Sequence, residues 1–254
     1  MKLPAAPSFR LDGREALVTG AGRGLGLAMA TALAHAGARV TLVARTGSEV
    51  EAAAKAIIDA GGSAQAVTLD VGDVEATANM VAAHGPFQVL VNNAGTNRPQ
   101  PLVDITEEDF DAVAGLNVRS AIFVAQSVAR GLIDAGLPGS IINISSQMGH
   151  VGGPNRTVYC ATKHAIEGAT KAMAWELGEH GIRVNTICPT FVETDMTRHM
   201  LDDPDFLGWV THKIALGRVG KPEDVMGAAV FLASDASSLI TGSAIMVDGG
   251  WTAA

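Results

Sequence analysis

The sequence predicts an α/β protein with a doubly wound parallel sheet of about seven strands and helices on both faces. Short β-branched runs alternate with longer alanine-rich stretches along the 254 residues, as in a sheet with crossover helices. The runs are continuously apolar, as expected of strands that helices cover on both sides. No linker, repeat or low-complexity tract interrupts this alternation. We therefore expect residues 1–254 to form a single domain.

Each predicted element follows from a local signal. The strands are the short β-branched runs at residues 16–18, 40–43, 66–69, 89–91, 141–144, 184–187 and 244–247. The helices are the longer stretches around residues 24–35, 49–60, 73–84, 107–132, 158–180 and 222–233. The last helix opens with Pro222, Glu223 and Asp224, and proline and acidic residues favour the first turn of a helix.

One stretch, residues 190–217, breaks the alternation. It has no predicted strand but carries five large apolar side chains, namely Met196, Met200, Phe206, Leu207 and Trp209. Long insertions of this kind are usually binding loops, so we expect a substrate lid here. The alternative is a pair of ordinary packing helices.

Composition and charge exclude several classes of protein. Eighteen Lys and Arg against 26 Asp and Glu give a formal charge of −8, which argues against a protein that binds nucleic acid or an anionic membrane surface. With 48% hydrophobic and 17% charged residues, the chain is too apolar to be disordered. No apolar run approaches the roughly 18–20 residues that cross a bilayer, and the N-terminus lacks a signal-peptide core. Two cysteines without pairing spacing suit a reducing compartment, so we expect a cytoplasmic protein.

A glycine-rich loop follows the first predicted strand. Residues Thr19–Gly26 read T-G-A-G-R-G-L-G and lead into a helix. Glycines at such a turn let the backbone approach a phosphate, and the helix N-terminus supplies amide donors and positive potential. The spacing departs from G-x-G-x-x-G because Leu25 stands where the third glycine would fall. It reads instead T-G-x-x-x-G-x-G, and a tight turn that binds nothing is the alternative.

With motifs further along the chain, this loop resembles the short-chain dehydrogenase/reductase family over essentially the whole length. Asn92–Gly95 after the fourth strand and Val247–Gly250 at the last strand match two of its motifs. Four further residues match its active site in order and spacing: Asn117, Ser146, Tyr159 and Lys163. Pro189-Thr190 departs from the usual Pro-Gly. The resemblance implies a Rossmann fold and hydride transfer between a nicotinamide dinucleotide and a secondary alcohol or ketone.

Tyr159 and Lys163 carry the predicted chemistry, because four residues of separation place them on one helix face. A phenol of pKa about 10 is a poor base at neutral pH. A nearby ammonium favours the phenolate, so we expect a lowered pKa for Tyr159, the only tyrosine in the chain. Ser146 can hydrogen-bond the substrate oxygen, with Ser145 as the alternative. The resemblance implies that Lys163 also holds the nicotinamide ribose and that Asn117 anchors a water.

The end of the second strand predicts the dinucleotide. An acid about twenty residues beyond the glycine loop selects NAD, whereas an arginine accepts the 2′-phosphate of NADP. The sequence has Ala44-Arg45 with no acid before Glu49, and Arg23 lies within the glycine loop. Two guanidinium groups predict a phosphate clamp, so we expect NADP(H) to be favoured over NAD(H). Two solvated surface arginines are the alternative.

The resemblance implies the remaining cofactor contacts. Asp70 and Val71 match the adenine contact of the family, and Thr194 matches its carboxamide contact. The others are Gly20, Gly24, Leu25, Gly26, Asn93, Ala94, Gly95, Pro189 and Val192, together with Tyr159 and Lys163.

Within the family the chain resembles the gluconate 5-dehydrogenase and 3-oxoacyl-thioester reductase branches. Arg98 and Arg156 are candidates for holding a carboxylate. Further candidate contacts are polar, His150 and Asn155, or apolar, Met148, Met196, Met200 and Trp209. We expect a small polar hydroxy or keto compound such as a sugar acid. A 3-oxoacyl-thioester reductase and a non-catalytic dinucleotide sensor are the alternatives.

No metal site is expected, because the seven histidines form no ligand-spaced pair with a carboxylate or a thiolate. The predicted helices 107–132 and 158–180 carry small and apolar residues on more than one face. This suggests burial against a second copy of the chain, and the resemblance implies a homotetramer. The expected partners are thus a small-molecule substrate and further copies, with no nucleic acid and no membrane.

Overall fold

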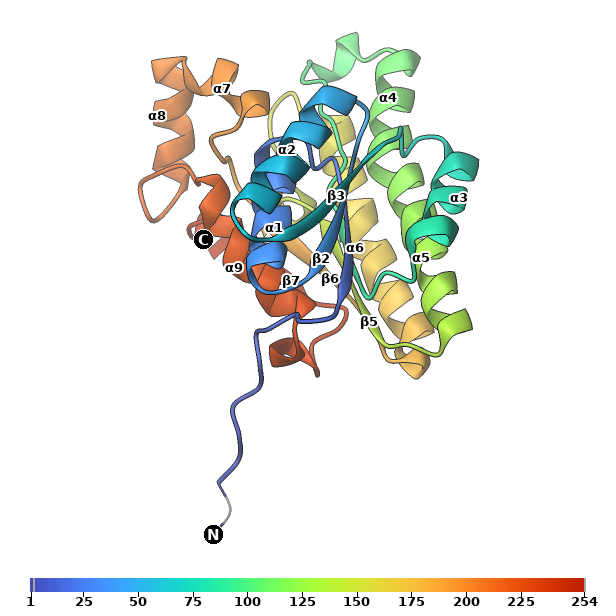
Figure 1. Cartoon of the computed structure of the whole chain (residues 1–254). Helices are drawn as coiled ribbons and strands as arrows, with labels where there is room; N and C mark the ends of the chain where they lie inside the picture. Colours follow the sequence, from blue (N-terminus) through green and yellow to red (C-terminus); the bar gives the residue numbers. More distant parts are fainter. Residues whose placement is uncertain (2, 254) are drawn as a thin grey trace.

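A seven-stranded sheet forms the centre of the computed structural model, which describes residues 1 and 3–253 (Figure 1). Its strands are β1 (Glu15–Thr19), β2 (Arg39–Ala44), β3 (Ser63–Thr68), β4 (Val89–Asn92), β5 (Gly139–Ile144), β6 (Ile182–Pro189) and β7 (Ala244–Val247). They pair in parallel in the order β3-β2-β1-β4-β5-β6-β7. This confirms the predicted sheet. The strand order reverses at β1 and β4, and ligands bind at such a point, beyond the carboxyl ends of the strands.

Two helical layers cover the sheet. The helices are α1 (Gly24–His35), α2 (Gly47–Asp59), α3 (Val74–His84), α4 (Glu107–Ala114), α5 (Ala121–Ala135), α6 (Thr157–Leu177), α7 (Asp195–Leu201), α8 (Pro204–Lys213) and α9 (Pro222–Ala233). Residues of α1, α2 and α9 share one core with the strands, and residues of α3, α5 and α6 share the other. Every residue of β4 and β5 is buried between these layers, which explains why the strand sequences are continuously apolar.

The predicted helix 107–132 is interrupted. Helix α4 ends at Ala114, a π-helical segment, η2 (Gly115–Ser120), follows, and α5 begins at Ala121. Such π-helical turns are rare and frequently lie at functional sites, and Asn117 lies in this one.

The stretch Glu107–Ala135 is also long and apolar enough to cross a membrane, since an 18-residue window within it has a mean hydropathy of 1.3. This corrects the expectation that no segment is long and apolar enough to cross a bilayer. In the structure α5 packs against α3 and the sheet, and its buried residues belong to a core cluster. The apolarity of this stretch is therefore that of a core helix and is weak evidence for a membrane span.

Residues 190–217 contain two helices, α7 and α8, which stand beside the sheet (Figure 1). They pack around Phe191, Val210 and Ile214, and the ring centroids of Trp209 and Trp251 lie 5.6 Å apart in this cluster. The alternative of two packing helices therefore describes the secondary structure of this stretch. A lid motion of these helices stays a prediction.

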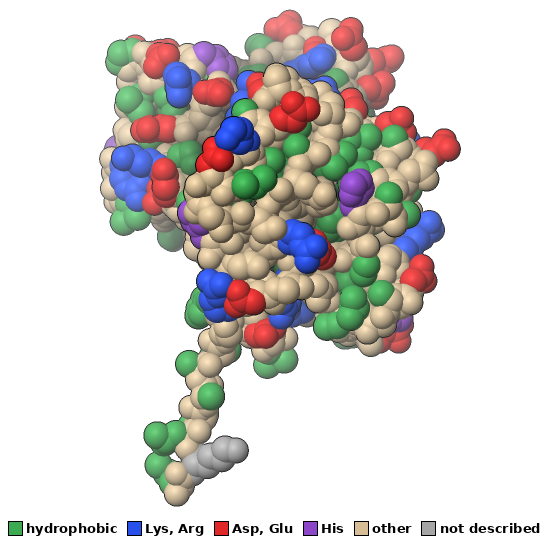
Figure 2. Space-filling model, in the orientation of Figure 1, with side chains coloured by type: hydrophobic (Ala, Val, Ile, Leu, Met, Phe, Trp, Pro, Cys, Tyr) green, Lys and Arg blue, Asp and Glu red, His purple; other side chains and the backbone are tan. Residues whose placement is uncertain are grey.

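The surface view agrees with the negative charge of the chain. On the face shown in Figure 2, Lys and Arg side chains lie scattered beside Asp and Glu rather than gathered into one patch. Several are ion-paired in the structure, as Arg10 is with Asp12 and Lys55 with Asp59. This face offers no extended basic surface of the kind that binds a phosphate backbone.

Candidate active site

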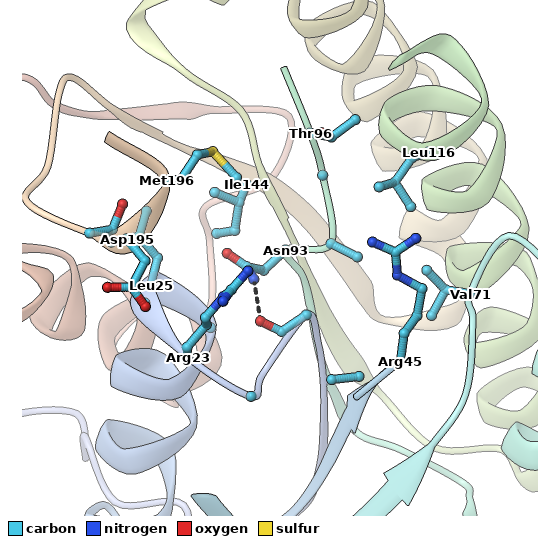
Figure 3. Close-up of a pocket in the computed structure, with 18 of the residues that line it drawn as sticks. Arg23, Leu25, Arg45, Val71, Asn93, Thr96, Leu116, Ile144, Asp195 and Met196 are labelled. Carbon is cyan, nitrogen blue, oxygen red and sulfur yellow. Dashed lines mark hydrogen bonds between the residues drawn. The ribbon is translucent and has the colours of Figure 1, made fainter. Parts of the chain in front are cut away.

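A cleft of about 330 Å³ opens at the carboxyl edge of the sheet (Figure 3). The predicted site residues that line it are Gly20, Arg23, Gly24, Leu25, Gly26, Arg45, Asp70, Val71, Asn93, Ala94, Gly95, Ser146, Tyr159, Lys163, Pro189, Val192, Thr194 and Met196. The structure thus brings all the predicted cofactor contacts and three of the four predicted catalytic residues to one cleft. Most of them come from loops or helix starts that follow neighbouring parallel strands, and Tyr159 and Lys163 come from α6.

The glycine loop requires glycine at specific positions. Gly20 and Gly24 have φ values of +63° and +57°, which side chains other than glycine rarely adopt. A Cβ atom at Gly26 would lie 2.2 Å from the carbonyl oxygen of Gly20. Helix α1 can therefore begin directly against the loop only because Gly26 has no side chain. This arrangement brings backbone amides to the cleft, where they can bind a phosphate.

Asn93 ties the loop after β4 to the glycine loop. Its Nδ2 donates to the carbonyl oxygens of Thr19 and Gly20 at 3.0 and 3.1 Å. In return, Thr19 Oγ1 accepts from the backbone N–H groups of Asn93 and Ala94, each at 3.0 Å. These four hydrogen bonds fix the distance between two walls of the cleft.

Arg23 and Arg45 lie on opposite sides of the cleft opening (Figure 3). Arg23 Nη1 lies 3.4 Å from Glu49 Oε1, and the Arg23 side chain is 66% exposed, so this ion pair is weak. Glu49 lies beyond the end of β2, so its position in the sequence did not predict a contact with the glycine loop. Helix α2 returns it to the glycine loop, where a Cβ atom at Gly22 would lie 3.1 Å from Glu49 Cβ. A phosphate bound between the two guanidinium groups would displace this pairing.

Tyr159 and Lys163 line the cleft from α6, with Lys163 Nζ 5.5 Å from the centroid of the Tyr159 ring. Burial raises the pKa of Tyr159 above its ordinary value, and this outweighs the opposite effects of the Ser146 hydroxyl and of Arg156. The expected lowering is therefore wrong for the cofactor-free protein. Lys163 Nζ donates to the carbonyl oxygen of Ile144 at 2.8 Å, and burial lowers its own pKa to about 8.

Ser146 is the serine that faces the phenol, since its hydrogen bond lowers the pKa of Tyr159. Its Oγ donates to Gln147 Oε1 at 2.6 Å and accepts from the backbone N–H of Met148 at 3.1 Å. The contact with Gln147 was not predictable from residue spacing. Ser145, the alternative, faces the thiol of Cys188 instead, close enough to lower the pKa of that thiol. Its buried Oγ makes no hydrogen bond of normal geometry.

Asn117 lies behind the cleft. Its Oδ1 accepts from the backbone N–H of Thr96 at 2.8 Å, and its Nδ2 donates to Thr96 O at 2.9 Å and to Thr162 Oγ1 at 3.1 Å. The side chain thus joins η2 to the loop after β4 and to α6. Because both donors of Nδ2 are used, an anchored water would have to bind a carbonyl oxygen of Asn117.

The structure separates the two arginines proposed for a substrate carboxylate. Neither arginine lines the cleft, and Arg98 is already neutralised by Asp109 at 2.7 Å and Glu108 at 3.7 Å. Arg156 is only 7% exposed, and its Nη2 lies 3.1 Å from Met200 Sδ. No carboxylate of the described residues lies within ion-pair distance of Arg156, and its charge lowers the pKa of Tyr159. Arg156 therefore remains the stronger candidate.

The other substrate candidates divide between the cleft and its surroundings. Met196 lines the cleft, whereas Met148, Met200 and Trp209 belong to the cluster under α7 and α8, which also contacts Tyr159. Asn155 adopts a left-handed turn with a φ of +58°, and its carbonyl oxygen accepts from the backbone N–H of Gln100.

His150 turns toward the protein interior instead. Its Nε2 lies 3.5 Å from both Cys188 Sγ and Glu167 Oε1. The histidines have no ligand spacing in the sequence, but the structure brings His150 to a carboxylate and a thiol, because the middle of α6 packs against the end of β6. The one signal in the sequence was that Glu167 follows Lys163 by four residues on the same helix.

Comparison with known proteins agrees with this geometry. A family model described as "Enoyl-(Acyl carrier protein) reductase" matches residues 20–252. The chain belongs to this family of short-chain dehydrogenases and reductases. The resemblance that the motifs carried is thus confirmed, and with it the class of oxidoreductase that acts on CH–OH groups.

Individual relatives match over nearly the whole chain. L-xylulose reductase from Bos taurus is 44% identical over 245 residues, which cover 96% of this chain and 99% of that protein. Gluconate 5-dehydrogenase from Gluconobacter oxydans (strain 621H) is 40% identical over 248 residues and 96% of each chain. The solved gluconate 5-dehydrogenase from Burkholderia cenocepacia J2315, in complex with NADP and tartrate, has a TM-score of 0.92 at 39% identity and covers 97% of this chain and 98% of its own.

Proposed function

We propose that this protein is an NADP(H)-dependent oxidoreductase that moves hydride to or from a secondary alcohol or ketone of a small polyhydroxylated compound, with a sugar acid as the favoured substrate. Arg156 carries the choice of an acid, because it is a buried guanidinium beside Tyr159 without a carboxylate partner among the described residues. A buried cation is costly unless an anion pairs with it. A substrate carboxylate would supply that anion.

The cleft fits a nicotinamide dinucleotide. The glycine loop can pack against the start of α1 only because Gly26 lacks a side chain, and this packing presents the backbone amides of the helix N-terminus to a phosphate. Thr190 Oγ1 is buried at the cleft without a hydrogen-bond partner, which suits a polar group such as a carboxamide. Arg23 and Arg45 suit the 2′-phosphate that distinguishes NADP. The NADP-bound gluconate 5-dehydrogenase supports the same choice. Bound in this cleft, NADPH would supply the hydride for ketone reduction.

Side chains of the protein supply the proton that the reduced carbonyl oxygen needs. Because its pKa is raised, the Tyr159 phenol is protonated at neutral pH and can donate to the carbonyl oxygen during reduction. The Ser146 hydroxyl can donate a hydrogen bond to the same oxygen as it gains charge. The Lys163 ammonium stabilises the phenolate that remains. Oxidation of an alcohol needs that phenolate at the start, so rising pH favours oxidation.

Reduction of a 3-oxoacyl thioester is the second candidate. The apolar cluster under α7 and α8 reaches Tyr159 and would suit an acyl chain, and Met196 is 56% exposed at the cleft. A 3-oxoacyl group has no carboxylate near its ketone for Arg156 to bind, so the effect of replacing Arg156 separates the two candidates. The reductase and dehydrogenase names of the relatives speak against a non-catalytic sensor.

Replacing Arg156 tests the proposed acid substrate. We expect Arg156→Gln to raise KM for acidic substrates about 10- to 100-fold, since a charge-assisted hydrogen bond contributes about 1.5–3 kcal/mol. KM for neutral keto-sugars should change little. Arg98→Gln is the matched control, because the structure pairs Arg98 with Asp109 outside the cleft, and it should leave both values unchanged. An equal rise for acidic and neutral substrates with Arg156→Gln would contradict the assignment.

We further propose that residues 190–217 act as a lid within the single domain. Thr194, Asp195 and Met196 line the cleft at the start of α7, so bound cofactor would contact this stretch directly. Amide hydrogens of α7 and α8 should exchange faster than those of β4 and β5 in the free protein and slow down when NADP binds. Exchange that does not change with cofactor would rule out the lid.

Finally, we propose a cytoplasmic homotetramer formed through α4, α5 and α6. Phe110 is 50% exposed and Trp175 is 89% exposed, and Phe110, Val118 and Val158 line a shallow apolar cavity between these helices. Exposed apolar patches of this kind favour association. Light scattering should give the mass of four chains, and the mass of one chain would contradict the proposal. Two free cysteines support a reducing compartment.

A further inference from the structure

Three potential metal ligands converge behind the catalytic residues. His150 follows the short helix η3 (Gln147–Gly149), Glu167 lies on α6, and Cys188 lies on β6. The His150 Nε2 atom is 3.5 Å from Cys188 Sγ and 3.5 Å from Glu167 Oε1, and Sγ and Oε1 are 3.3 Å apart. One imidazole nitrogen, one carboxylate oxygen and one sulfur thus form a nearly equilateral triangle.

The size of this triangle is that of one face of a zinc tetrahedron. Zinc binds nitrogen and oxygen at about 2.0–2.2 Å and sulfur at about 2.3 Å, so tetrahedral ligand atoms lie roughly 3.3–3.6 Å apart. All three observed separations agree with these values. A cation placed above the triangle would need only small side-chain movements.

Among the described residues, His150 is the one cationic group that can pair with the buried carboxylate of this cluster. Glu167 is 7% exposed and Cys188 is fully buried. Glu167 accepts from Thr186 Oγ1 at 3.1 Å and from the Cys188 thiol at 3.3 Å, and no lysine or arginine of the described part of the chain lies within ion-pair distance of it. A buried carboxylate without a compensating charge is costly, so with a neutral imidazole this place favours a bound cation.

Ser145 gives a second, independent indication. It is 3% exposed, and its Oγ makes no hydrogen bond of normal geometry with the described residues. The backbone at Gly149 leaves space for this hydroxyl, since a Cβ atom there would lie 2.8 Å from Ser145 Oγ and 3.2 Å from Glu167 Cγ. A buried polar atom without a partner often marks the place of an ion or a water.

We propose that His150, Glu167 and Cys188 form a zinc-binding site, with Ser145 or a water as the fourth ligand. Binding would replace the thiol proton, which passes to solvent, so Zn²⁺ would be held by a neutral imidazole, a carboxylate and a thiolate with no net charge. Sulfur and imidazole ligands suit zinc, whereas Mg²⁺ and Ca²⁺ require oxygen ligands. The ion can enter past His150, whose side chain is 34% exposed.

The site would join three elements that carry the active site. Ser146 lies next to Ser145, Lys163 lies one turn before Glu167 on α6, and Pro189 follows Cys188 on β6. A bound zinc ion would therefore fix the relative positions of η3, α6 and the end of β6. Its role is structural, since His150, Glu167 and Cys188 do not line the cofactor cleft and only Ser145 reaches it.

Cobalt titration of the metal-free full-length protein tests this site. After dialysis against a chelator, Co²⁺ should bind at one equivalent per chain and give the thiolate-to-cobalt charge-transfer band and the intense d–d bands of a tetrahedral site, and Zn²⁺ should abolish both. Cys188→Ser should lose the charge-transfer band, and Glu167→Gln should bind at least tenfold more weakly. Cys160→Ser is the matched control, because Cys160 lies outside the cluster, and it should behave as the wild type.

If Cys188→Ser does not fold, His150→Gln tests the site instead. His150 is the most exposed of the three ligands, so its replacement should disturb folding least. Zinc should raise the unfolding temperature of the wild type and of Cys160→Ser but not that of His150→Gln. The absence of a charge-transfer band in the wild type, or its persistence in Cys188→Ser, would overturn the proposal. An equal thermal shift in His150→Gln would do the same.

Discussion

Tyr159→Phe is expected to lower kcat by about 10²–10⁴-fold, the usual contribution of a positioned general acid. The substitution removes only the hydroxyl group that donates the proton, and the ring can keep its packing against the cluster under α7 and α8. Binding of NADPH, followed by fluorescence, should stay within about twofold, because the phosphate-binding loop and Arg45 are untouched.

Two measurements distinguish the loss of the proton donor from a folding defect. Tyr159 is the only tyrosine, so the variant can be verified by the loss of the phenol signal in the ultraviolet spectrum. Its unfolding temperature should stay close to that of the wild type. A folded Tyr159→Phe that binds NADPH and keeps more than about a tenth of the wild-type kcat would show that another group donates the proton.

Arg45→Asp is expected to lower kcat/KM for NADPH about 100-fold while leaving kcat/KM for NADH nearly unchanged. The substitution removes a charge-assisted hydrogen bond to the 2′-phosphate, worth about 1.5–3 kcal/mol, and places a like charge beside it. An acid at the end of β2 is also the group that binds the ribose 2′-hydroxyl of NAD.

Arg39→Asp is the matched control for Arg45→Asp. Arg39 begins the same strand, at the edge of the sheet opposite the cleft, and its side chain is 65% exposed where it pairs with Glu15 at 3.1 Å. It should leave the ratio of NADPH to NADH efficiency unchanged. If both variants lowered that ratio equally, the effect would come from net charge and not from a specific phosphate contact.

The sheet and the cleft were predictable because their determinants are local. Continuous burial makes β4 and β5 mostly apolar, and the turn after β1 needs glycines that are visible in the sequence. Parallel strands end at one edge, so motifs that follow different strands had to meet. Ser146, Tyr159 and Lys163 line one cleft for this reason.

The features that were missed depend on contacts between distant residues. The pKa of Tyr159 follows from how deeply α6 is buried, and sequence spacing shows only that Lys163 is near. Arg98 and Arg156 are equivalent candidates in the sequence, but in the structure Asp109 neutralises Arg98. The triangle of His150, Glu167 and Cys188 forms because α6 and β6 pack together, and no spacing rule joins residues of separate elements.

We propose above that the protein transfers hydride between NADP(H) and a small polyhydroxylated acid, so NADPH should reduce the ketone form of such an acid. The most direct test is the rate of NADPH oxidation by the wild-type protein with a keto-aldonic acid, a neutral ketose and a 3-oxoacyl thioester, each measured for kcat/KM under the same conditions. We predict the highest kcat/KM for the keto-aldonic acid, a lower value for the ketose, and a shift toward the ketose in Arg156→Gln. A higher value for the thioester, or no NADPH oxidation with either sugar compound, would contradict the account.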